Sequence, residues 1–241
     1  MQLLLTSDLH YNLRHLDWLL SVADQFDVVV VAGDHLDISS SVALESQSIV
    51  VLRYLARLAA RTTVIASSGN HDLTTRNEHG EKTAAWLAQG RLVGALVDGD
   101  SFDKDGVRIT VCPWWDGPST RRDVDAQLRE QARDRSTWWI WVYHPPPSNS
   151  PTALGAKREY GDQDLRTWIT DLQPDVVLTG HVHEAPFVDG GSWFEHLGST
   201  WTFNAGRLGV GTVPNHVALD LERRLASWYG GGESAELSLD Q

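Results

Sequence analysis

The chain has 241 residues, with 32 acidic side chains against 20 lysines and arginines, so its formal net charge is −12. This acidic balance argues against non-specific binding to duplex nucleic acid, which depends on a broad basic surface. The single cysteine, Cys112, excludes an intrachain disulfide framework. No run approaches 18 apolar residues and the N-terminus lacks the basic segment of a signal peptide, so we expect a cytoplasmic protein that makes no membrane contact.

Five short apolar runs predict the strands of a buried sheet. Each run is too short for a helix and is rich in β-branched or aromatic residues, which is typical of strands buried on both faces. The runs lie at residues 3–5, 28–31, 64–66, 138–143 and 176–178. Segments with helical periodicity lie between them, at residues 16–23, 49–59 and 168–172. This alternation predicts a largely parallel sheet with crossover helices.

The pattern changes after about residue 90 to hairpin-like segments. Residues 101–104 and 107–112 flank an Asp-Gly turn signal, and a second meander runs over residues 192–229. We therefore expect a single α/β domain over residues 1–229, built as a four-layer α-β-β-α sandwich of two mixed sheets flanked by helices. The glycine-rich segment 230–241 has the composition of a loosely held C-terminal tail.

Polar residues follow each of the five apolar runs. In open α/β sheets the loops at the carboxyl ends of parallel strands line one crevice, so these residues are expected to converge. In chain order they are Asp8 and His10, then Gly33-Asp34, then Gly69-Asn70-His71-Asp72, then His144, and finally Gly180-His181-Val182-His183.

The side-chain types in this set predict a metal centre. Carboxylates, an amide and imidazoles without a thiolate exclude a cysteine-based zinc site and suit Mn²⁺, Fe, Zn²⁺, Ni²⁺ or Co²⁺ better than Ca²⁺ or Mg²⁺ alone. The set holds more ligands than one ion needs, which indicates two ions about 3.5–4 Å apart. Within Asp8-x-His10 and His181-x-His183, alternation along an extended backbone sends both side chains of each pair to one side.

The order of these motifs between residues 8 and 183 resembles that of the calcineurin-like metallophosphoesterases. That family shows Asp-x-His, Gly-Asp, Gly-Asn-His-(Asp/Glu), His and Gly-His-x-His in this sequence. The resemblance implies one divalent ion held by Asp8, His10 and His183 and a second held by Asn70, His144 and His181. Asp34 would bridge the two ions, of which manganese is the favoured identity.

The resemblance also implies hydrolysis of a phosphoric ester by a hydroxide shared between the ions, attacking phosphorus in line with the leaving oxygen. His71 is then the leaving-group acid, and Asp72 is expected to orient its imidazole. Hydrolysis of a phosphodiester is favoured. The alternatives are a phosphomonoesterase, a nuclease or DNA-repair component, and a non-catalytic scaffold on the same fold. We expect a small phosphoester or nucleotide-like substrate in preference to nucleic acid, and the sequence does not specify an oligomeric state.

Four residues outside the metal set are candidates for substrate binding: His35, Arg121, Arg122 and Arg207. His35 is otherwise a polar loop residue, and Arg207 follows an Asn-x-Gly turn as a candidate phosphate clamp. Arg121 and Arg122 follow Trp114-Trp115, which together suit a nucleotide platform, but a tryptophan at the sheet edge and a solvated helix start explain them better. Residues 145–160 are either a lid or an ordinary surface loop.

Overall fold

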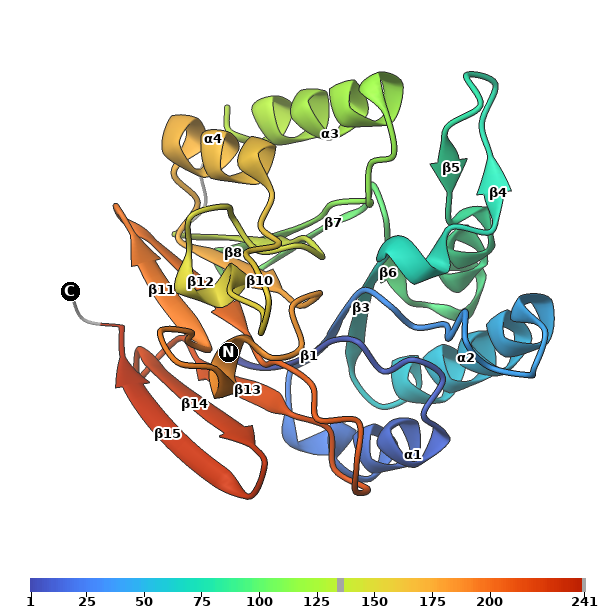
Figure 1. Ribbon diagram of the computed structural model, residues 1–241, viewed down its shortest axis with the longest axis horizontal. Coiled ribbons are helices and arrows are strands. Elements are labelled where there is room, and N and C mark those ends of the chain that lie inside the picture. Colours follow the sequence, from blue (N-terminus) through green and yellow to red (C-terminus); the bar gives the residue numbers. More distant parts are fainter. Residues whose placement is uncertain (134–136, 240–241) are drawn as a thin grey trace.

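The computed structural model describes residues 1–133 and 137–239 and contains two large mixed β-sheets. The strand order of the first sheet is β15-β14-β13-β1-β2-β3-β6 (Figure 1). Its strands are β1 (Gln2–Thr6), β2 (Val28–Ala32), β3 (Thr63–Ser67), β6 (Leu96–Val97), β13 (His216–Asp220), β14 (Leu225–Gly230) and β15 (Glu233–Ser238). The neighbouring strands β1, β2, β3 and β6 pair in parallel. On the other side of β1, strands β13, β14 and β15 each pair antiparallel with their neighbours.

The second sheet has the order β11-β12-β10-β9-β8-β7. Its strands are β7 (Ser101–Lys104), β8 (Val107–Val111), β9 (Trp138–Val142), β10 (Val176–Thr179), β11 (Phe194–Leu197) and β12 (Thr200–Asn204). The four central strands are parallel, while β7 and β11 close the two edges as antiparallel strands. A separate short hairpin, β4 (Thr75–Arg76) and β5 (Lys82–Thr83), stands at the edge of the molecule (Figure 1).

Helices cover the outer face of each sheet, which confirms the expected four-layer sandwich. The first sheet packs against α1 (Leu13–Val22), α2 (Leu44–Ala59) and the 3₁₀ segment η3 (Ala85–Val93). The second sheet packs against α3 (Pro118–Gln131) and α4 (Gln163–Leu172). Shorter 3₁₀ turns are η1 (Ala23–Gln25), η2 (Asn70–Asp72), η4 (Pro151–Ala153) and η5 (Ala185–Phe187). No helix in the described ranges is both long enough and apolar enough to cross a membrane.

Alternation along the strands explains why the apolar runs are continuous. Leu3 and Leu5 pack into the core between the two sheets, whereas Leu4 packs against the helices. On the other sheet Ile140 faces the core between the sheets, and Trp139 faces the helices. Both faces of each central strand are therefore buried over most of its length, which explains why apolar residues follow one another without a break.

The prediction of a domain that ends at residue 229 with a loose tail from residue 230 is wrong. Strand β15 pairs with β14 at six positions, from Gly230 with Glu233 to Leu225 with Ser238. The side chain of Leu239, only 3% exposed, enters the core between the sheets. Three consecutive glycines precede β15, and their composition is typical of a flexible tail, so the sequence did not indicate the strand that follows them. Residues 240–241 lie outside the described residues.

The pairing of β15 predicts that residues 231–239 contribute to stability. Ending the chain at Gly230 removes Leu239, and burial of a leucine side chain contributes about 1.5–3 kcal/mol. We expect the free energy of unfolding in urea to fall by at least about 2 kcal/mol. A chain that ends at residue 239 is the matched control and should unfold like the full-length protein. An unchanged urea midpoint for the shorter chain would restore the interpretation of a dispensable tail.

Candidate metal centre

The candidate site lies where the parallel strands of both sheets end. Strands β1, β2 and β3 deliver their loops from one sheet, and β9, β10 and β12 deliver theirs from the other. Backbone hydrogen bonds hold neighbouring loops together, because Asp8 N donates to Gly33 O at 3.0 Å and Gly180 N donates to His144 O at 2.8 Å. The sequence prediction that the five segments converge is confirmed by this arrangement.

Several site residues adopt left-handed backbone conformations. The φ angles are 53° at Asp8, 43° at His10, 55° at Asp34 and 66° at His181. Such conformations cost about 1–3 kcal/mol each in non-glycine residues and cluster at functional sites. The side chains of Asp8 and His10 are thus brought together by a tight turn. The expectation that extended-strand alternation does this is wrong, because the strand ends at Thr6.

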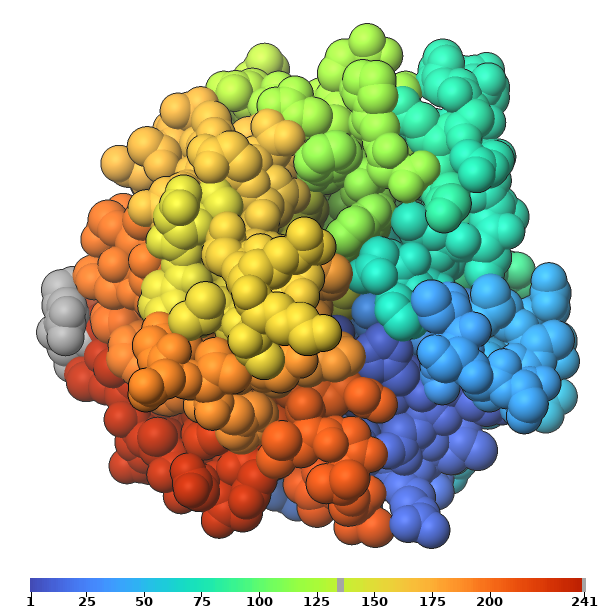
Figure 2. All heavy atoms as spheres, in the orientation of Figure 1, coloured from blue at the N-terminus to red at the C-terminus, as the bar shows by residue number. Residues whose placement is uncertain are grey.

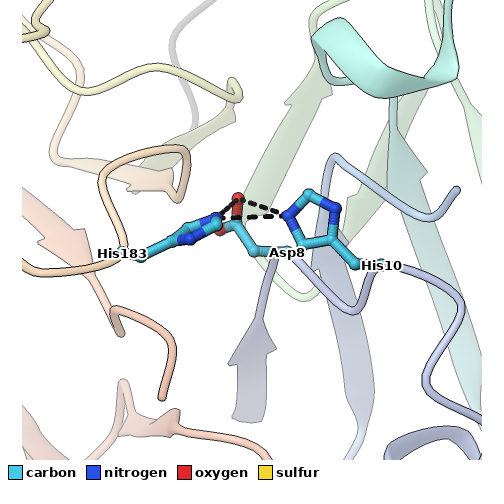
Figure 3. Close-up of side chains that lie close together, drawn as sticks. All are labelled: Asp8, His10 and His183. Carbon is cyan, nitrogen blue, oxygen red and sulfur yellow. Dashed lines mark hydrogen bonds and ion pairs between the residues drawn. The ribbon is translucent and has the colours of Figure 1, made fainter. Parts of the chain in front are cut away.

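Asp8, His10 and His183 form the first ligand cluster. Figure 3 shows the rings of His10 and His183 directed toward the Asp8 carboxylate. The distance from His183 Nε2 to Asp8 Oδ1 is 3.2 Å, and the two Nε2 atoms of the histidines are also 3.2 Å apart. Three potential donor atoms therefore surround one point, as the ligands of a common ion do.

Asp34, His144 and His181 form the second cluster. The distance from His144 Nε2 to Asp34 Oδ2 is 3.4 Å, and the same oxygen lies 3.7 Å from His10 Nε2 of the first cluster. Asp34 thus lies between the two clusters, where a shared ligand belongs. Asn70 Oδ1 and His144 Nε2 are buried without a hydrogen-bond partner, and a bound cation is the partner that both atoms lack. The residues present therefore fit divalent metal binding.

His71 lies beside both clusters. Its Nε2 is 3.8 Å from Asp34 Oδ2, and its ring meets the His10 ring edge-on with the centroids 4.5 Å apart. The His71 side chain is 22% exposed. His10, Asp34 and His71 also satisfy the spacing of a metal cluster, so distance alone suits His71 either as a ligand or as a group that faces the substrate.

The protonation states of the histidines around the carboxylates differ. Burial lowers the pKa of His10 and of His181 to about 4 each. Burial also acts to lower the pKa of His144, but the carboxylates of Asp34 and Asp8 outweigh it and raise the pKa to about 9. Burial acts to raise the pKa of Asp8, but the hydrogen bond from His183 and the neighbouring histidines hold it well below its usual range. The carboxylates are therefore ready to bind cations.

Hydrogen bonds fix the orientation of the ligands. His144 Nδ1 donates to Ala32 O at 2.7 Å, which leaves Nε2 free to face the centre. Ser7 Oγ donates to Asp8 Oδ2 at 2.5 Å, and His181 N donates to the same oxygen at 3.0 Å. Partners of this kind set the ligand geometry and the tautomer of a metal-binding histidine. Sequence reasoning missed Ser7, since a lone serine beside a motif carries no distinguishing signal.

The family model for calcineurin-like phosphoesterases matches residues 1–185. The chain belongs to this family. It is therefore a metal-dependent phosphoester hydrolase, and the family implies that divalent metal ions act at the His/Asp clusters. No curated protein matches the chain.

Solved structures support the fold of this calcineurin-like phosphoesterase. The crystal structure of TT1561 from Thermus thermophilus is 15% identical and has a TM-score of 0.64, with coverage of 99% of this chain and 98% of that chain. The purple acid phosphatase PPD1 from yellow lupin seeds is 16% identical, with a TM-score of 0.63. The alignment covers 99% of this chain and 53% of the lupin protein, so this chain spans about half of that enzyme's length.

Asp72 does not orient the His71 imidazole, so that prediction is wrong. Its Oδ1 accepts the backbone N–H groups of His35 and Leu36, both at 3.0 Å, and its Oδ2 accepts the N–H of Gly69 at 2.8 Å. His71 Nδ1 has no hydrogen-bond partner. The fully buried Asp72 instead joins the loop after β2 to the loop after β3, so its role in this phosphoesterase is to position those loops.

His35 does not face a substrate, so that prediction is also wrong. Its side chain is buried, and its Nε2 donates to Ser67 O at 2.9 Å. Its ring lies edge-on to Trp86, with the centroids 6.0 Å apart. Because the backbone N–H of His35 is bound by Asp72, the residue belongs to the support of the loops.

The two arginines near the start of α3 differ in their surroundings. The Arg121 guanidinium pairs with the Asp164 carboxylate and lies 5.8 Å from the Trp168 ring centroid. Arg122 is exposed on the same helix. These contacts favour the alternative of a solvated helix start, and a role of either arginine in substrate binding stays a prediction.

Arg207 lies close to the first cluster. Its backbone N–H donates to His183 O at 2.9 Å, and its charge contributes to lowering the pKa of His10. It lines a small cavity together with Ser7 and Asp8, and its Nε is buried without a partner. The loop after β12 thus places the positively charged Arg207 side chain beside the first cluster. The role of Arg207 as a phosphate clamp stays a prediction.

Gly69 is required for the close packing of the second cluster. A Cβ atom at this position would overlap Asp34 Oδ1 and come within 2.8 Å of His144 Nε2. We expect Gly69→Ala to weaken binding of the second ion at least about tenfold, because a ligand must move by a large part of an ångström. Gly80→Ala, where the added atom meets nothing within 4 Å but φ is 79°, is the control for a strained alanine far from any ligand overlap. Equal metal affinity for the two variants by calorimetry would contradict this packing argument.

The raised pKa of His144 predicts that metal binding releases a proton. Below about pH 9 the metal-free protein holds a proton on His144 that a cation must displace, whereas His10 and His181 are already neutral above about pH 4. Affinity for the second ion should therefore fall about tenfold for each pH unit below 9. Calorimetry in buffers of different ionisation enthalpy measures the released proton. A metal affinity that stays constant between about pH 6.5 and 8.5 would show that no proton is displaced from His144.

Proposed function

We propose that this phosphoesterase is a dinuclear-metal-dependent phosphodiesterase. Asp34 carries the proposal, because one carboxylate oxygen lies 3.7 Å from His10 of the first cluster and 3.4 Å from His144 of the second. A carboxylate in that position suits two cations better than one. When bound, two such cations lower the pKa of a shared water toward about 7 and neutralise charge on the phosphoryl oxygens.

The ligands of each ion follow from the two clusters. Asp8, His10 and His183 would hold the first ion, and Asn70, His144 and His181 the second, with Asp34 shared. We propose Mn²⁺ as the preferred ion, with Fe, Zn²⁺, Ni²⁺ and Co²⁺ as the other cations suited to mixed imidazole and carboxylate ligands. The cytoplasmic location and the preference for a small ester over nucleic acid stay predictions from the sequence.

His71 is the proposed leaving-group acid. The backbone N–H of His71 donates to Asp34 Oδ1 at 2.9 Å, and its ring Nε2 lies 3.8 Å from Asp34 Oδ2. The His71 side chain is partly exposed, and each ligand set already has two other histidines without it. A proton on His71 Nε2 can therefore pass to the departing ester oxygen, while the other histidines point into the clusters.

His71→Ala separates the role of an acid from that of a ligand. If His71 donates a proton, the variant should keep two bound metals and lose roughly 10²–10⁴-fold in kcat. Elemental analysis and turnover of bis(p-nitrophenyl) phosphate with Mn²⁺ measure the two quantities. His79→Ala, which removes an exposed histidine from the β4–β5 hairpin, is the matched control. Loss of a metal equivalent in His71→Ala would show that His71 is a ligand.

The preference for diesters is tested by comparing bis(p-nitrophenyl) phosphate with p-nitrophenyl phosphate. An open cavity beside His181 offers room for a second ester group, which a monoester lacks. We expect a higher kcat/KM for the diester at saturating metal. A higher kcat/KM for the monoester would assign the chain as a phosphomonoesterase.

A further inference from the structure

A cavity of about 400 Å³ adjoins the second cluster. Figure 2 shows the surface hollowed between the yellow segment that precedes α4 and the green segment that begins α3. His181, a proposed ligand, lines the cavity together with Trp114. The centroid of the Trp114 ring lies 5.5 Å from that of His181 and 5.8 Å from that of His144, so a group in the cavity would lie next to the second cluster. A volume of this size suits a small organic group.

Aromatic rings form much of the cavity wall. Trp114, Trp115, Tyr143 and Tyr160 all contribute to it. The polar atoms of two of them are already bound, because Trp115 Nε1 and Tyr143 Oη both donate to Asp162 Oδ2, at 3.2 Å and 2.5 Å. These hydrogen bonds fix both side chains in place. Tyr143 is buried, so the aromatic surface open to a ligand comes mainly from Trp114 and Trp115, which are partly exposed.

The remaining charge in the cavity is negative. Three aspartates line it, Asp116, Asp162 and Asp164, and in the described ranges it has no lysine or arginine in its lining. Arg121 neutralises Asp164 from outside the cavity. Arg158 lies 4.8 Å from the Tyr160 ring centroid at the exposed rim. Three aspartates against these two arginines leave one net negative charge, which disfavours a second phosphate and favours a cation.

We propose that this cavity binds an alkylammonium group carried by one ester arm of the substrate. The inference rests on the proposed phosphodiesterase function and names its substrate class: a zwitterionic diester with an anionic phosphate and a positively charged amino or quaternary ammonium group. Aromatic faces attract such cations through their quadrupoles, and nearby carboxylates add to the attraction. The metal centre takes the phosphate, and the cavity takes the cation.

The cavity holds the ester group that stays on phosphorus. It borders His181 and Trp114, whereas His71, the proposed leaving-group acid, is outside its described lining. The leaving alcohol and the ammonium group are thus bound by different residues. A substrate with a good leaving group on one arm and the cation on the other therefore tests the cavity alone.

The experiment compares p-nitrophenyl phosphorylcholine with its neutral isostere, 3,3-dimethylbutyl p-nitrophenyl phosphate. The two esters share shape and leaving group and differ by the positive charge. We expect kcat/KM to be about tenfold higher for the choline ester in the Mn²⁺-loaded protein. Trp115→Leu and Asp116→Asn should each lower this ratio severalfold, mainly through the choline ester.

Two controls keep this comparison specific. Trp115→Phe retains an aromatic face and should keep most of the preference. Asp105→Asn makes the same charge change at the opposite end of β8, in the turn between β7 and β8, and should leave the ratio unchanged. A direct measurement on the metal-free protein complements the kinetics. Tetramethylammonium should bind in ligand-observed NMR, and Trp115→Leu should abolish the binding.

The outcomes distinguish the inference from the proposed function. Hydrolysis of both esters at equal kcat/KM, with no effect of Trp115→Leu on the ratio, would overturn the ammonium site and leave the phosphodiesterase in place. Faster turnover of thymidine 5′-(p-nitrophenyl phosphate) than of the choline ester would assign the cavity to a base. If the metal-loaded protein hydrolyses no diester, the function fails, and the tetramethylammonium measurement still decides whether the cavity binds a cation.

Discussion

The hydrogen bond from His144 Nδ1 to Ala32 O connects the two sheets at the edge where the site lies. Ala32 ends β2 of the first sheet, and His144 follows β9 of the second. The bond fixes the tautomer of His144, aims its Nε2 at Asp34 and sets the distance between the two groups of loops. Gly33, beside this bond, has a φ of 84° and no room for a Cβ, because His144 fills that space. The proposed second metal site depends on this contact.

The contact between the two sheets also brings the carboxylates of Asp8 and Asp34 into a buried position among the histidines. Asp8 and Asp34 are almost fully buried, and the histidines beside them, above all His183 for Asp8 and His144 for Asp34, hold the pKa values of both carboxylates below their usual range. Burial of charge without such partners is costly, so the centre is a place of stored electrostatic strain that bound cations relieve. The left-handed backbones of Asp8, His10 and His181 add conformational strain at the same point.

Much of the fold was predictable because central strands carry a local signal. Continuous apolar runs such as 28–31 identified the parallel strands, and the polar residues after them identified the site. The partners of individual side chains were less predictable, since Asp72 and His35 bond to backbone groups far along the chain. Strand β15 was missed because its alternation follows three glycines, and the cavity beside Trp114 was missed because residues 114–116, 143 and 160–164 meet only in the folded chain.

The most direct test of the two-ion centre is anomalous diffraction at the manganese edge from crystals of the Mn²⁺-loaded protein. The account predicts two peaks about 3.5–4 Å apart, with the Asp34 carboxylate between them and Asn70 Oδ1 turned toward the peak nearer His144. A single peak, or a peak within bonding distance of His71 Nε2, would contradict it.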